Sequence, residues 1–491
     1  QNEYVYIFRD RVGVKPLYYY HKDNLFIFGS ELKALVKHPE FEKQLNKDAL
    51  SMYLQFGYIH APYTIYEHTH KLLAGHYIQY ELSSKKFKTV KYWDIVDYYM
   101  MEKLELSETE AEKQLEEILI ESFNFRMVSD VPVGSFLSGG IDSSLVTAIL
   151  QKHNKEKINT FTIGFEDEKY NEAHYAKKIA DHLGTNHSEY YCTKQDALNL
   201  IPLLPQMYDE PFADSSAIPT ALVSKLAKEK VTVVLSGDGG DEIFGGYSSY
   251  ELFENRLAMI RKIPAKKTIN ALLELIPDPI FLLQYINEKY YLKYLKLKNV
   301  MKYDNVADMF KLSNAVFSKD EVSQILTGQY HYQNELNLNT LHNLEQMMVS
   351  DFKGYLADDI LVKVDRATMH ISLEGREPLL DHKILEFAAR LPISFKQNKN
   401  ILKNILAKYI PTELFERKKQ GFGIPINDWL REDLKFLIDK YLSEERILAQ
   451  NIFNLKYVQQ LKDLFFLAKN DDRKIWTLLM FQMWYEKEFE T

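Results

Sequence analysis

The distribution of apolar and polar positions separates a β-rich front, residues 1–93, from a longer remainder. The segments "YVYIFRD", "KPLYYYHKDNLFIFGS" and "GHYIQYELSSKKFKTVKYW" alternate as half-buried strands do, with turns expected at Asn24 and at Ser83-Ser84. A helix is expected over "SELKALVKHP", with Ser30 as its N-cap. The front of the chain is therefore predicted to be mainly β-structure.

A long helix is predicted to begin near Ser107, after an acidic and polar stretch, residues 95–110, that we interpret as a linker. Ser107 and Glu110 have the spacing of a capping box. Apolar residues then recur on one face of the helix, at Leu115, Ile118, Leu119 and Phe123. The pattern predicts an amphipathic helix.

Between residues 131 and about 250, short apolar strands alternate with helices. The strands are expected in "VPVGSFLS", "INTFTIGF" and "VTVVLSG", and a helix is expected near 172–183. This alternation is typical of a parallel, doubly wound α/β sheet. Residues 250–491 are predicted to be mostly helical, so the expected fold class is α/β with a helical C-terminal part.

Composition and charge argue against some classes of function. The 491 residues carry a formal net charge of −8, which argues against a general nucleic-acid-binding surface. No apolar run reaches the roughly 20 residues that a membrane span needs. The single cysteine, Cys192, excludes internal disulfides and, with no signal segment, favours a cytoplasmic protein. A homodimer is compatible with the sequence, but no segment indicates one.

The stretch "FLSGGIDSSL" places two glycines, three hydroxyls and one carboxylate between a strand and a helix. Ligands of parallel sheets bind at this place, and the N–H groups of a helix N-terminus attract anions. Gly139 and Gly140 let the backbone approach a bulky ligand, while Ser138, Ser143 and Ser144 supply hydroxyl donors. The pattern predicts a phosphate-binding turn that differs from the P-loop in having no lysine.

Asp142 is the unusual member of this turn, because a carboxylate beside phosphates needs a cation between them, and Mg²⁺ prefers such shared oxygen ligands. The alternative is that the negative charge of Asp142 only stabilises the N-terminus of the helix. A second strand, in "VTVVLSGDGGDEIFGGY", also ends in glycines and carboxylates. Asp142 and Asp241 are therefore predicted to hold one Mg²⁺ from opposite sides, and an acidic surface turn is the alternative for the second segment.

Backbone groups at two strand ends are expected to contact a nucleotide. Ser236 and Gly237 follow the strand "VTVVL", and Ile163 lies near the end of "INTFTIGF", where its backbone would read the edge of an adenine ring. An ordinary buried strand has the same pattern as the second segment, so that motif is weak by itself.

Several segments resemble the asparagine synthetase family, whose synthetase domain belongs to the PP-loop ATP pyrophosphatases. "FLSGGIDSS", "LSGDGGDEIFGGY", "YDEPFADSSAIPT", "YLADDILVKVDRATMHISLEGREPLLDH" and "RKKQGFGIPINDWL" resemble that domain. "RDRVGVKPLYYY" and "FGSELKAL" resemble the end of the family's glutaminase domain, an αββα N-terminal-nucleophile fold. The resemblance implies an incomplete glutaminase domain at 1–94, a linker at 95–110 and a synthetase domain at 111–491.

The resemblance implies a reaction, its cofactors and most of its site. In the family, ATP activates the side-chain carboxylate of aspartate as an acyl-adenylate, pyrophosphate leaves, and ammonia, obtained from glutamine, displaces AMP to give asparagine. ATP and Mg²⁺ are thus the implied cofactors. The implied pyrophosphate contacts are Ser138, Gly139, Gly140, Ser143 and Ser144. The implied nucleotide contacts are Leu137, Ile163, Ser236 and Gly237, and the implied Mg²⁺ ligands are Asp142 and Asp241.

Four more residues are assigned catalytic roles by the resemblance. Asp238 matches a position tied to forming the acyl-adenylate, and Lys419 matches a lysine that stabilises charge during adenylation. A surface basic cluster is the alternative for Lys419. Glu374 and Arg376 are expected to contact substrate, and a structural ion pair involving Asp381 is their alternative.

The front of the chain departs from the family pattern. The family's glutaminase begins with a cysteine that supplies both thiol and amine, whereas this chain begins with Gln1 and its only cysteine is Cys192. We expect Cys192 to be a small buried apolar side chain. We also expect the natural N-terminus to lie upstream, the intact gene product to depend on glutamine, and the chain as given to use free ammonia.

Three other functions stay open at this point. A family member acting on another carboxylate, such as a sugar acid, would carry the same motifs. A distant relative that modifies tRNA is disfavoured by "RDRVGVKPLYYY" and by the acidic net charge. A nucleotide-binding regulatory protein is disfavoured because binding alone does not require Asp142, Asp238, Asp241 and Lys419 together.

Overall fold

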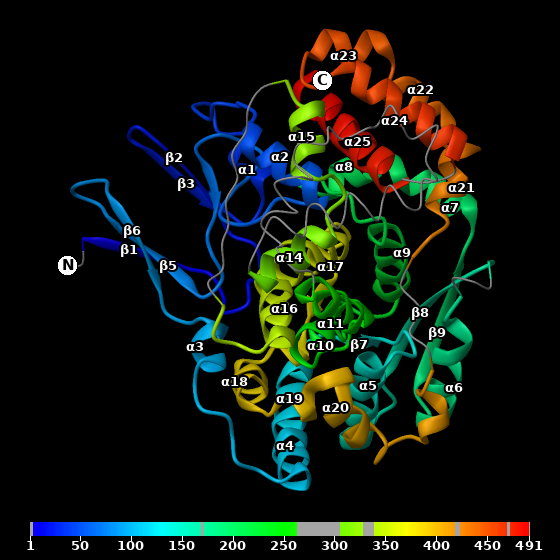
Figure 1. The fold of residues 1–491 in the computed structure, drawn as a ribbon. Coiled ribbons are helices and arrows are strands. Elements are labelled where there is room, and N and C mark those ends of the chain that lie inside the picture. Colours follow the sequence, from blue (N-terminus) through cyan, green and yellow to red (C-terminus); the bar gives the residue numbers. More distant parts are fainter. Residues whose placement is uncertain are drawn as a thin grey trace.

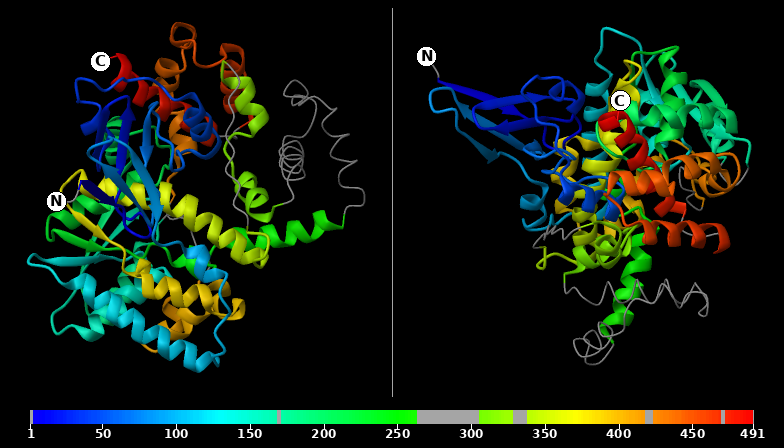
Figure 2. Two further views of the ribbon diagram at one scale, coloured as in Figure 1. Left: turned by 90° about the vertical axis from the view of Figure 1, so that its left-hand side faces the viewer. Right: turned by 90° about the horizontal axis from the view of Figure 1, so that it is seen from above.

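The computed structural model describes residues 3–167, 171–262, 305–327, 338–417, 423–468 and 472–490. Two small antiparallel sheets from the front of the chain lie at one side of the molecule (Figure 2). A five-stranded parallel sheet and its helices form the main body (Figure 1). The described chain is thus an α/β fold with a helical C-terminal part, as the sequence pattern predicts.

The front contains two three-stranded sheets that pack on each other. One has the order β1-β5-β6, formed by β1 (Tyr4–Phe8), β5 (His76–Glu81) and β6 (Phe87–Lys91). The other has the order β3-β2-β4, formed by β2 (Tyr18–Lys22), β3 (Leu25–Gly29) and β4 (Thr69–Lys71). Ile7, Tyr19, Leu72 and Ile78 form their shared core. The turns predicted at Asn24 and Ser83-Ser84 are confirmed, since they join β2 to β3 and β5 to β6.

The helix predicted after Gly29 is shorter than expected. Helix α1 spans only Leu32–Leu35 and its N-cap is Glu31, so the prediction of Ser30 as the cap is wrong. The carbonyl oxygen of Ser30 instead accepts a hydrogen bond from Arg366 Nη2 at 2.6 Å. This partner is distant in the sequence, and a local capping pattern cannot reveal it.

The parallel sheet has the order β11-β10-β7-β8-β9. Its strands are β7 (Val133–Phe136), β8 (Asn159–Phe165), β9 (Asn186–Cys192), β10 (Val233–Leu235) and β11 (Glu374–Arg376). From β7 the chain adds β8 and β9 on one side and then crosses to β10 on the other. The strand order therefore reverses at β7, and ligands of open α/β sheets bind in the crevice at such a point.

Helices on the sheet belong to two large hydrophobic cores. Helices α4 (Glu108–Met127), α5 (Ile141–His153) and α6 (Ala173–Leu183) share one core, and α9 (Ala217–Lys228) belongs to the other. The predicted capping box of α4 is confirmed, because the side chains of Ser107 and Glu110 each accept the other's backbone N–H. Its predicted apolar face is buried at Leu115, Leu119 and Phe123 and half-buried at Ile118.

The described parts of residues 250–491 are mostly helical, as predicted, and the front contains a helix, α2 (Lys47–Phe56), that the β-rich pattern did not predict. The further helices of the described chain include α3 (Ile95–Tyr99), α7 (Lys194–Leu200), α8 (Leu204–Met207), α10 (Gly240–Ile243), α11 (Ser248–Arg261), α14 (Val306–Ser313), α15 (Lys319–Ile325), α16 (Asn343–Asp351), the π-helix η3 (Phe352–Ile360), α17 (Leu361–Met369), α18 (His382–Arg390), α19 (Ile393–Lys396), α20 (Asn400–Leu406), α21 (Ile426–Arg431), α22 (Lys435–Tyr441), α23 (Glu444–Gln450), α24 (Leu455–Ala468) and α25 (Asp472–Tyr485).

The stretch interpreted as a linker is bound to the main body. It contains α3, whose Ile95 and Tyr99 side chains are buried and which packs on α18. Lys103 Nζ forms an ion pair with Glu345 Oε1 at 2.7 Å and donates to the carbonyl oxygen of Ala389 at 2.8 Å. Residues 95–110 therefore do not form a free tether.

The front packs on the body through both apolar and charged contacts. Helices α2 and α25, far apart in the sequence, lie side by side (Figure 1), and Tyr53 Oη donates to the carbonyl oxygen of Thr477 at 2.7 Å. Lys15 forms an ion pair with Asp365 at 2.9 Å. These contacts join the front to elements of the C-terminal half.

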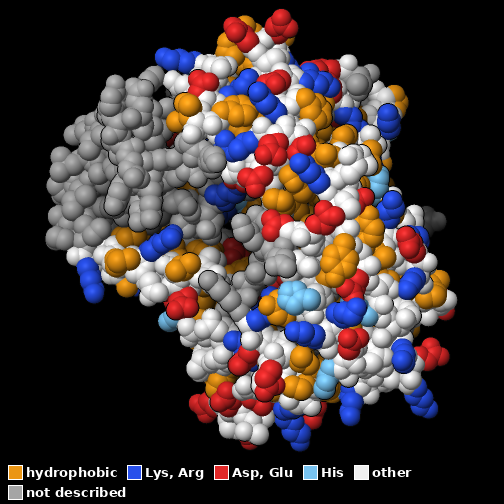
Figure 3. Space-filling view, turned by 90° about the vertical axis from the view of Figure 1, so that its right-hand side faces the viewer, with side chains coloured by type: hydrophobic (Ala, Val, Ile, Leu, Met, Phe, Trp, Pro, Cys, Tyr) orange, Lys and Arg blue, Asp and Glu red, His pale blue; other side chains and the backbone are white. Residues whose placement is uncertain are grey.

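Several expectations from composition can be compared with the structure. Cys192, at the end of β9, is buried among apolar side chains, as predicted. No described helix is both long and apolar enough to cross a bilayer. Figure 3 shows Lys and Arg interspersed with Asp and Glu on one face of the molecule.

A buried carboxyl beside the front–body contact predicts a pH dependence of stability. Burial raises the pKa of Glu377 to about 8, and nearby Lys15 only partly opposes this. The folded state then keeps a proton that the unfolded chain loses above its ordinary pKa of about 4.3, so stability falls as pH rises from about 4.3 to 8. Glu377→Gln should remove this loss and stabilise the protein at pH 8 by on the order of 2 kcal/mol.

Urea unfolding at pH 5.5 and pH 8 measures this effect. The wild-type midpoint should fall at pH 8, and the Glu377→Gln midpoint should change less. Exposed Glu105→Gln is the matched control and should follow the wild type. A Glu377→Gln variant with the same pH dependence as the wild type would contradict the prediction.

Candidate functional site

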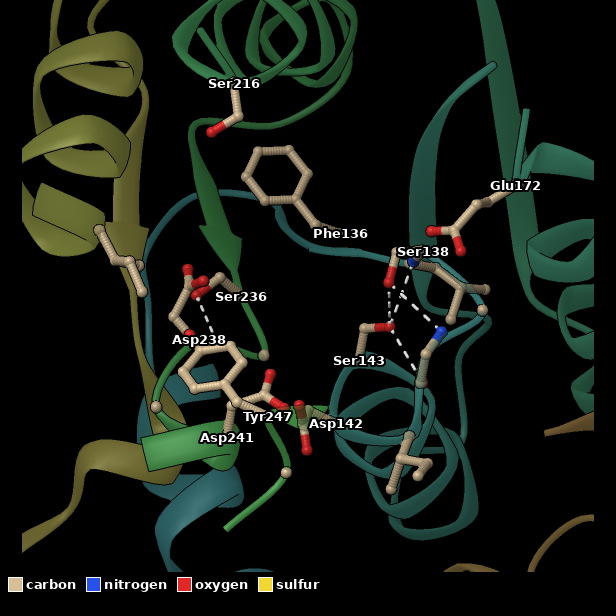
Figure 4. A pocket seen from close by; sticks show the side chains of 18 of the residues that line it. Phe136, Ser138, Asp142, Ser143, Glu172, Ser216, Ser236, Asp238, Asp241 and Tyr247 are labelled. Carbon is tan, nitrogen blue, oxygen red and sulfur yellow. Dashed lines mark hydrogen bonds between the residues drawn. The ribbon is translucent and has the colours of Figure 1, made fainter. Parts of the chain in front are cut away.

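A cavity of about 890 Å³ opens at the carboxyl ends of β7, β8 and β10, where the strand order reverses. Its walls come from segments far apart in the sequence: the turn after β7, the end of β8, the start of α9, the turn after β10, and the η3–α17 helix (Figure 4). This cavity is the candidate functional site.

The turn between β7 and α5 forms one wall of the cavity and is held by its own hydroxyl groups. Ser138 N–H donates to Ser143 Oγ at 3.1 Å, and Gly140 N–H donates to Ser138 Oγ at 3.3 Å (Figure 4). The first turn of a helix has N–H groups with no partner inside the helix and a positive partial charge. This wall is therefore suited to an anion such as a phosphate.

Glycines let the turn after β10 lie directly against the turn after β7. A Cβ atom on Gly237 would lie 2.7 Å from Ser143 N, and one on Gly240 would lie 2.3 Å from Asp142 Oδ1. Gly239 has a φ of +94°, in the left-handed region that favours glycine. The glycine-rich second motif is thus explained by the close approach of two backbones.

The carboxylates of Asp142 and Asp241 lie together in this cavity, with a lysine between them. Lys399 Nζ forms ion pairs with Asp142 Oδ2 and, at 2.8 Å, with Asp241 Oδ1. Burial by itself lowers the pKa of Lys399, but the two carboxylates raise it above its ordinary value. Lys399 therefore carries a charge that offsets the two buried carboxylates.

The paired carboxylates also suit a divalent cation that arrives with phosphates. Mg²⁺ is usually held by one or two carboxylates together with substrate phosphate oxygens and water. Among the described residues, no group of three or more His, Cys, Asp and Glu side chains could hold a metal ion. Asp142 and Asp241 are two carboxylates that line one cavity, so they could hold a divalent cation that arrives with phosphates.

Acidic side chains line the β10 side of the cavity. Asp238 lines the cavity, and its N–H donates to Ser236 Oγ at 3.4 Å (Figure 4). Burial raises the pKa of Asp238 above its ordinary value. Burial and the neighbouring Asp241 raise the pKa of Glu242 to about 8, and Tyr247 Oη donates to its carboxylate. Glu242 can therefore gain or lose a proton near neutral pH.

Apolar side chains line another part of the cavity. Phe136, Phe161, Ile163 and Val223 come from β7, β8 and α9. The N–H of Leu137 donates to the carbonyl oxygen of Phe161 at 2.9 Å, which ties the turn after β7 to β8. This region suits a flat apolar group such as a purine ring.

Most of the predicted site residues line this one cavity. They are Leu137, Ser138, Gly139, Gly140, Asp142, Ser143, Ile163, Ser236, Gly237, Asp238 and Asp241. Ser144 is the exception in the first motif: it is fully buried and does not line the cavity, and its expected pyrophosphate contact stays a prediction. Lys419 lies outside the described residues.

Glu374 and Arg376 lie away from the cavity, on the edge strand β11. Arg376 Nε donates to Glu374 Oε1 at 2.7 Å, and Arg376 Nη1 donates to the carbonyl oxygen of Arg126 at 2.7 Å. Neither residue lines the cavity, and their expected substrate contact stays a prediction. The two residues form an ion pair with each other, whereas Asp381 pairs with Arg126.

Sequence reasoning missed several charged residues of the cavity, among them Lys399, Lys363 and Asp214. Lys363 Nζ lies 2.7 Å from Asp214 Oδ2. Lys399 is one of several lysines in a polar segment, "KQNKN", and no local signal distinguishes it. Lys363 does carry a signal, because it lies in the apolar helical run "ILVKV", where an unpaired lysine would be costly.

The architecture places the protein in a broad class. A glycine-rich helix N-terminus beside paired carboxylates, at the switch point of a parallel sheet, defines an α/β protein built to bind a phosphorylated ligand.

Similarity to known proteins identifies the family within that class. Residues 114–486 match the family model for asparagine synthase, and residues 1–93 match that for a glutamine amidotransferase domain. A putative asparagine synthetase (glutamine-hydrolyzing) 2 of Methanocaldococcus jannaschii is 37% identical over 383 residues, which cover 74% of this chain and 69% of that protein. Asparagine synthetase (glutamine-hydrolyzing) 1 of Bacillus subtilis is 30% identical over 501 residues, which cover 100% and 76%. The chain therefore belongs to the asparagine synthase family of ATP-dependent ligases.

The glycine contact beside Asp142 predicts the effect of one methyl group. Gly240→Ala would force the Asp142 carboxylate to move, because the new Cβ would lie 2.3 Å from Oδ1. We expect ATP-dependent activity to fall by about 100-fold, the usual cost of losing one charge-stabilising group. Gly375→Ala is the control, since its Cβ would meet no atom closer than 3.4 Å. Equal activities of the two variants in a pyrophosphate-release assay would contradict the prediction.

Proposed function

We propose that this protein amidates aspartate to asparagine through a β-aspartyl-AMP intermediate. The observation that carries the proposal is the meeting of Asp142 and Asp241 beside the glycine-rich N-terminus of α5. A carboxylate is a poor electrophile, and adenylation gives it a good leaving group. The names of the relatives, asparagine synthetases, support aspartate as the acceptor.

The turn after β7 is proposed to act as a PP-loop that binds the pyrophosphate portion of ATP. Ser138 and Ser143 would donate through their hydroxyls, and Gly139 and Gly140 through their N–H groups, to phosphate oxygens. These donors are already held by hydrogen bonds within the turn, so little reorganisation accompanies the reaction.

The adenosine portion is proposed to occupy the apolar region of the cavity. Leu137 and Ile163 would contact the base, and the backbone of Ser236 and Gly237 would contact the nucleotide from the β10 side. The purine then lies away from the charged turn, and the α-phosphate lies between the two strand ends.

Charges around the phosphates are proposed to stabilise pyrophosphate as it leaves. Asp142 and Asp241 would hold Mg²⁺, which supplies charge neutralisation to the phosphate oxygens when bound. Lys399 adds positive charge at the same place. Asp238 is proposed to orient the acceptor for adenylation, and Lys419 to stabilise the charge that develops there.

We propose glutamine as the nitrogen source where an amidotransferase nucleophile is present, and free ammonia as the source that this chain uses. The glutamine amidotransferase domain matched by residues 1–93 supports the first assignment. Hydrolysis of glutamine requires a nucleophile, and the only cysteine of this sequence is the buried Cys192. Burial raises the pKa of its thiol to about 12, so it is not a nucleophile at neutral pH.

Isotope exchange between ATP and pyrophosphate tests the proposed reaction. We expect exchange that depends on aspartate but not on ammonium, because activation precedes nitrogen attack. Addition of ammonium should then give asparagine and AMP, while glutamine should not replace ammonium in this chain. Formation of ADP, or robust use of glutamine, would contradict the proposal. Exchange supported by another carboxylate but not by aspartate would point to a different acceptor.

The metal assignment predicts the effect of neutralising either carboxylate. Asp142→Asn and Asp241→Asn should each weaken Mn²⁺ binding, measured by electron paramagnetic resonance with a non-hydrolysable ATP analogue, by at least about 10-fold. Exposed Asp130→Asn is the control and should bind Mn²⁺ as the wild type does. Unchanged Mn²⁺ affinity in both site variants would remove these carboxylates from the metal site.

A further inference from the structure

A second buried lysine lines the cavity on the side away from the turn after β7. Lys363 belongs to α17, and its Nζ donates to Asp214 Oδ2 at 2.7 Å and to Ser216 Oγ at 2.8 Å. Figure 4 shows Ser216 across the cavity from Asp142 and Ser143. Among the cationic side chains that line the cavity, Lys399 therefore lies beside the turn after β7, whereas Lys363 lies at the end near the start of α9.

Asp214 and Ser216 hold the ammonium group of Lys363 in a fixed position. Asp214 Oδ1 accepts hydrogen bonds from Ser216 N–H at 2.9 Å and from Ser216 Oγ at 2.8 Å. The side chains of Lys363 and Asp214 are only 12% and 16% exposed. An ammonium group has three N–H donors, and Asp214 and Ser216 account for two of them. The remaining donor is available to a ligand in the cavity.

The charges around Lys363 leave it able to attract an anion. Burial opposes the charge on Asp214, but Lys363 lowers its pKa to about 2, so the two groups form an ion pair. Burial and Asp214 raise the pKa of the neighbouring Asp359 well above its ordinary value, which opposes a negative charge on that carboxyl. A carboxylate that reaches Lys363 therefore meets an ion pair in which the ammonium group has a third N–H donor.

Backbone geometry at this end of the cavity is also unusual. Helix α17 continues directly from η3, which is a π-helix over Phe352–Ile360. Such turns are rare and occur frequently at functional sites. Tyr355 and Ile360 of η3 line the same cavity as Lys363, so the irregular segment forms part of the wall around its ammonium group.

We propose that Lys363 binds the second carboxylate of the acceptor, the one that is not activated, and thereby selects a dicarboxylate. This inference rests on the proposed function, which places the reacting carboxylate beside Asp238. Lys363 and Asp238 both line this cavity, Lys363 from α17 and Asp238 from the turn after β10, so one short dicarboxylate in the cavity would have a group of each at its two ends. For aspartate, the α-carboxylate would form a charge-assisted hydrogen bond with Lys363.

This role is tested by measuring ATP–pyrophosphate exchange with each of three acceptors: aspartate, β-alanine and succinate. β-Alanine is aspartate without its α-carboxylate, and succinate is aspartate without its amino group. The wild type should prefer aspartate to β-alanine strongly, because a site built for a polar group rejects an analogue that lacks it. Lys363→Met should lower kcat/KM for aspartate by about 100-fold and bring the aspartate-to-β-alanine ratio close to one. The aspartate-to-succinate ratio should stay as in the wild type.

Two further variants distinguish a loss of acceptor recognition from a loss of folding. Lys363→Arg keeps the positive charge and should keep most of the preference for aspartate over β-alanine. Lys363→Met combined with Asp214→Asn removes both charges of the ion pair, so it avoids an unpaired buried carboxylate. The double variant should fold and should show the same loss of preference as Lys363→Met.

The outcomes distinguish this inference from the proposed function. A Lys363→Met variant that loses activity on all three acceptors in parallel would show a structural role and overturn the inference alone. A wild type that uses β-alanine as well as aspartate would also overturn it. A wild type that activates neither aspartate nor succinate would overturn the proposed function, and the inference with it.

Discussion

The contact between two backbone turns, one after β7 and one after β10, is the constraint on which the site depends. Gly237 and Gly240 lie so close to Ser143 and Asp142 that no side chain fits between them. This approach brings two carboxylates within reach of one cation, although they are separated by about a hundred residues of chain. Like charges at this distance repel in a low-dielectric interior, so the turn contact is stable only with a cation such as Lys399 or a divalent ion.

The placement of two lysines divides the cavity into ends with different chemistry. Lys399 lies between the two carboxylates near the anion-binding turn, while Lys363 lies with Asp214 and Ser216 near the start of α9. Each lysine is neutralised by aspartate in the absence of ligand, which limits the cost of burying it. A triphosphate and a short acid can therefore be held at the same time with their reacting groups between the strand ends.

The parts of the chain that carry no site residue still position it. The front sheets contact the body through α2 and α25 and through the ion pair of Lys15 with Asp365. Asp365 belongs to α17, the helix that also presents Lys363 to the cavity. Arg366 of the same helix donates to Ser30 in the front. The helix that supplies Lys363 is thus bound to the front of the chain by two of its charged side chains.

The sequence by itself determined the features that depend on neighbouring residues. These features are the capping box at Ser107, the turn at Asn24, the α/β alternation and the glycine-rich strand ends. Each depends on hydrogen bonds or dihedral angles within a few residues, so a local sequence pattern predicts it. Only the tertiary structure decided which side chains share a cavity. It buried Ser144 where it does not line the cavity, and it joined Glu374 to Arg376 on an edge strand. It also brought Lys399 to the carboxylates of Asp142 and Asp241. This ion pairing depends on the packing of segments that are distant in the sequence, so no local sequence pattern reveals it.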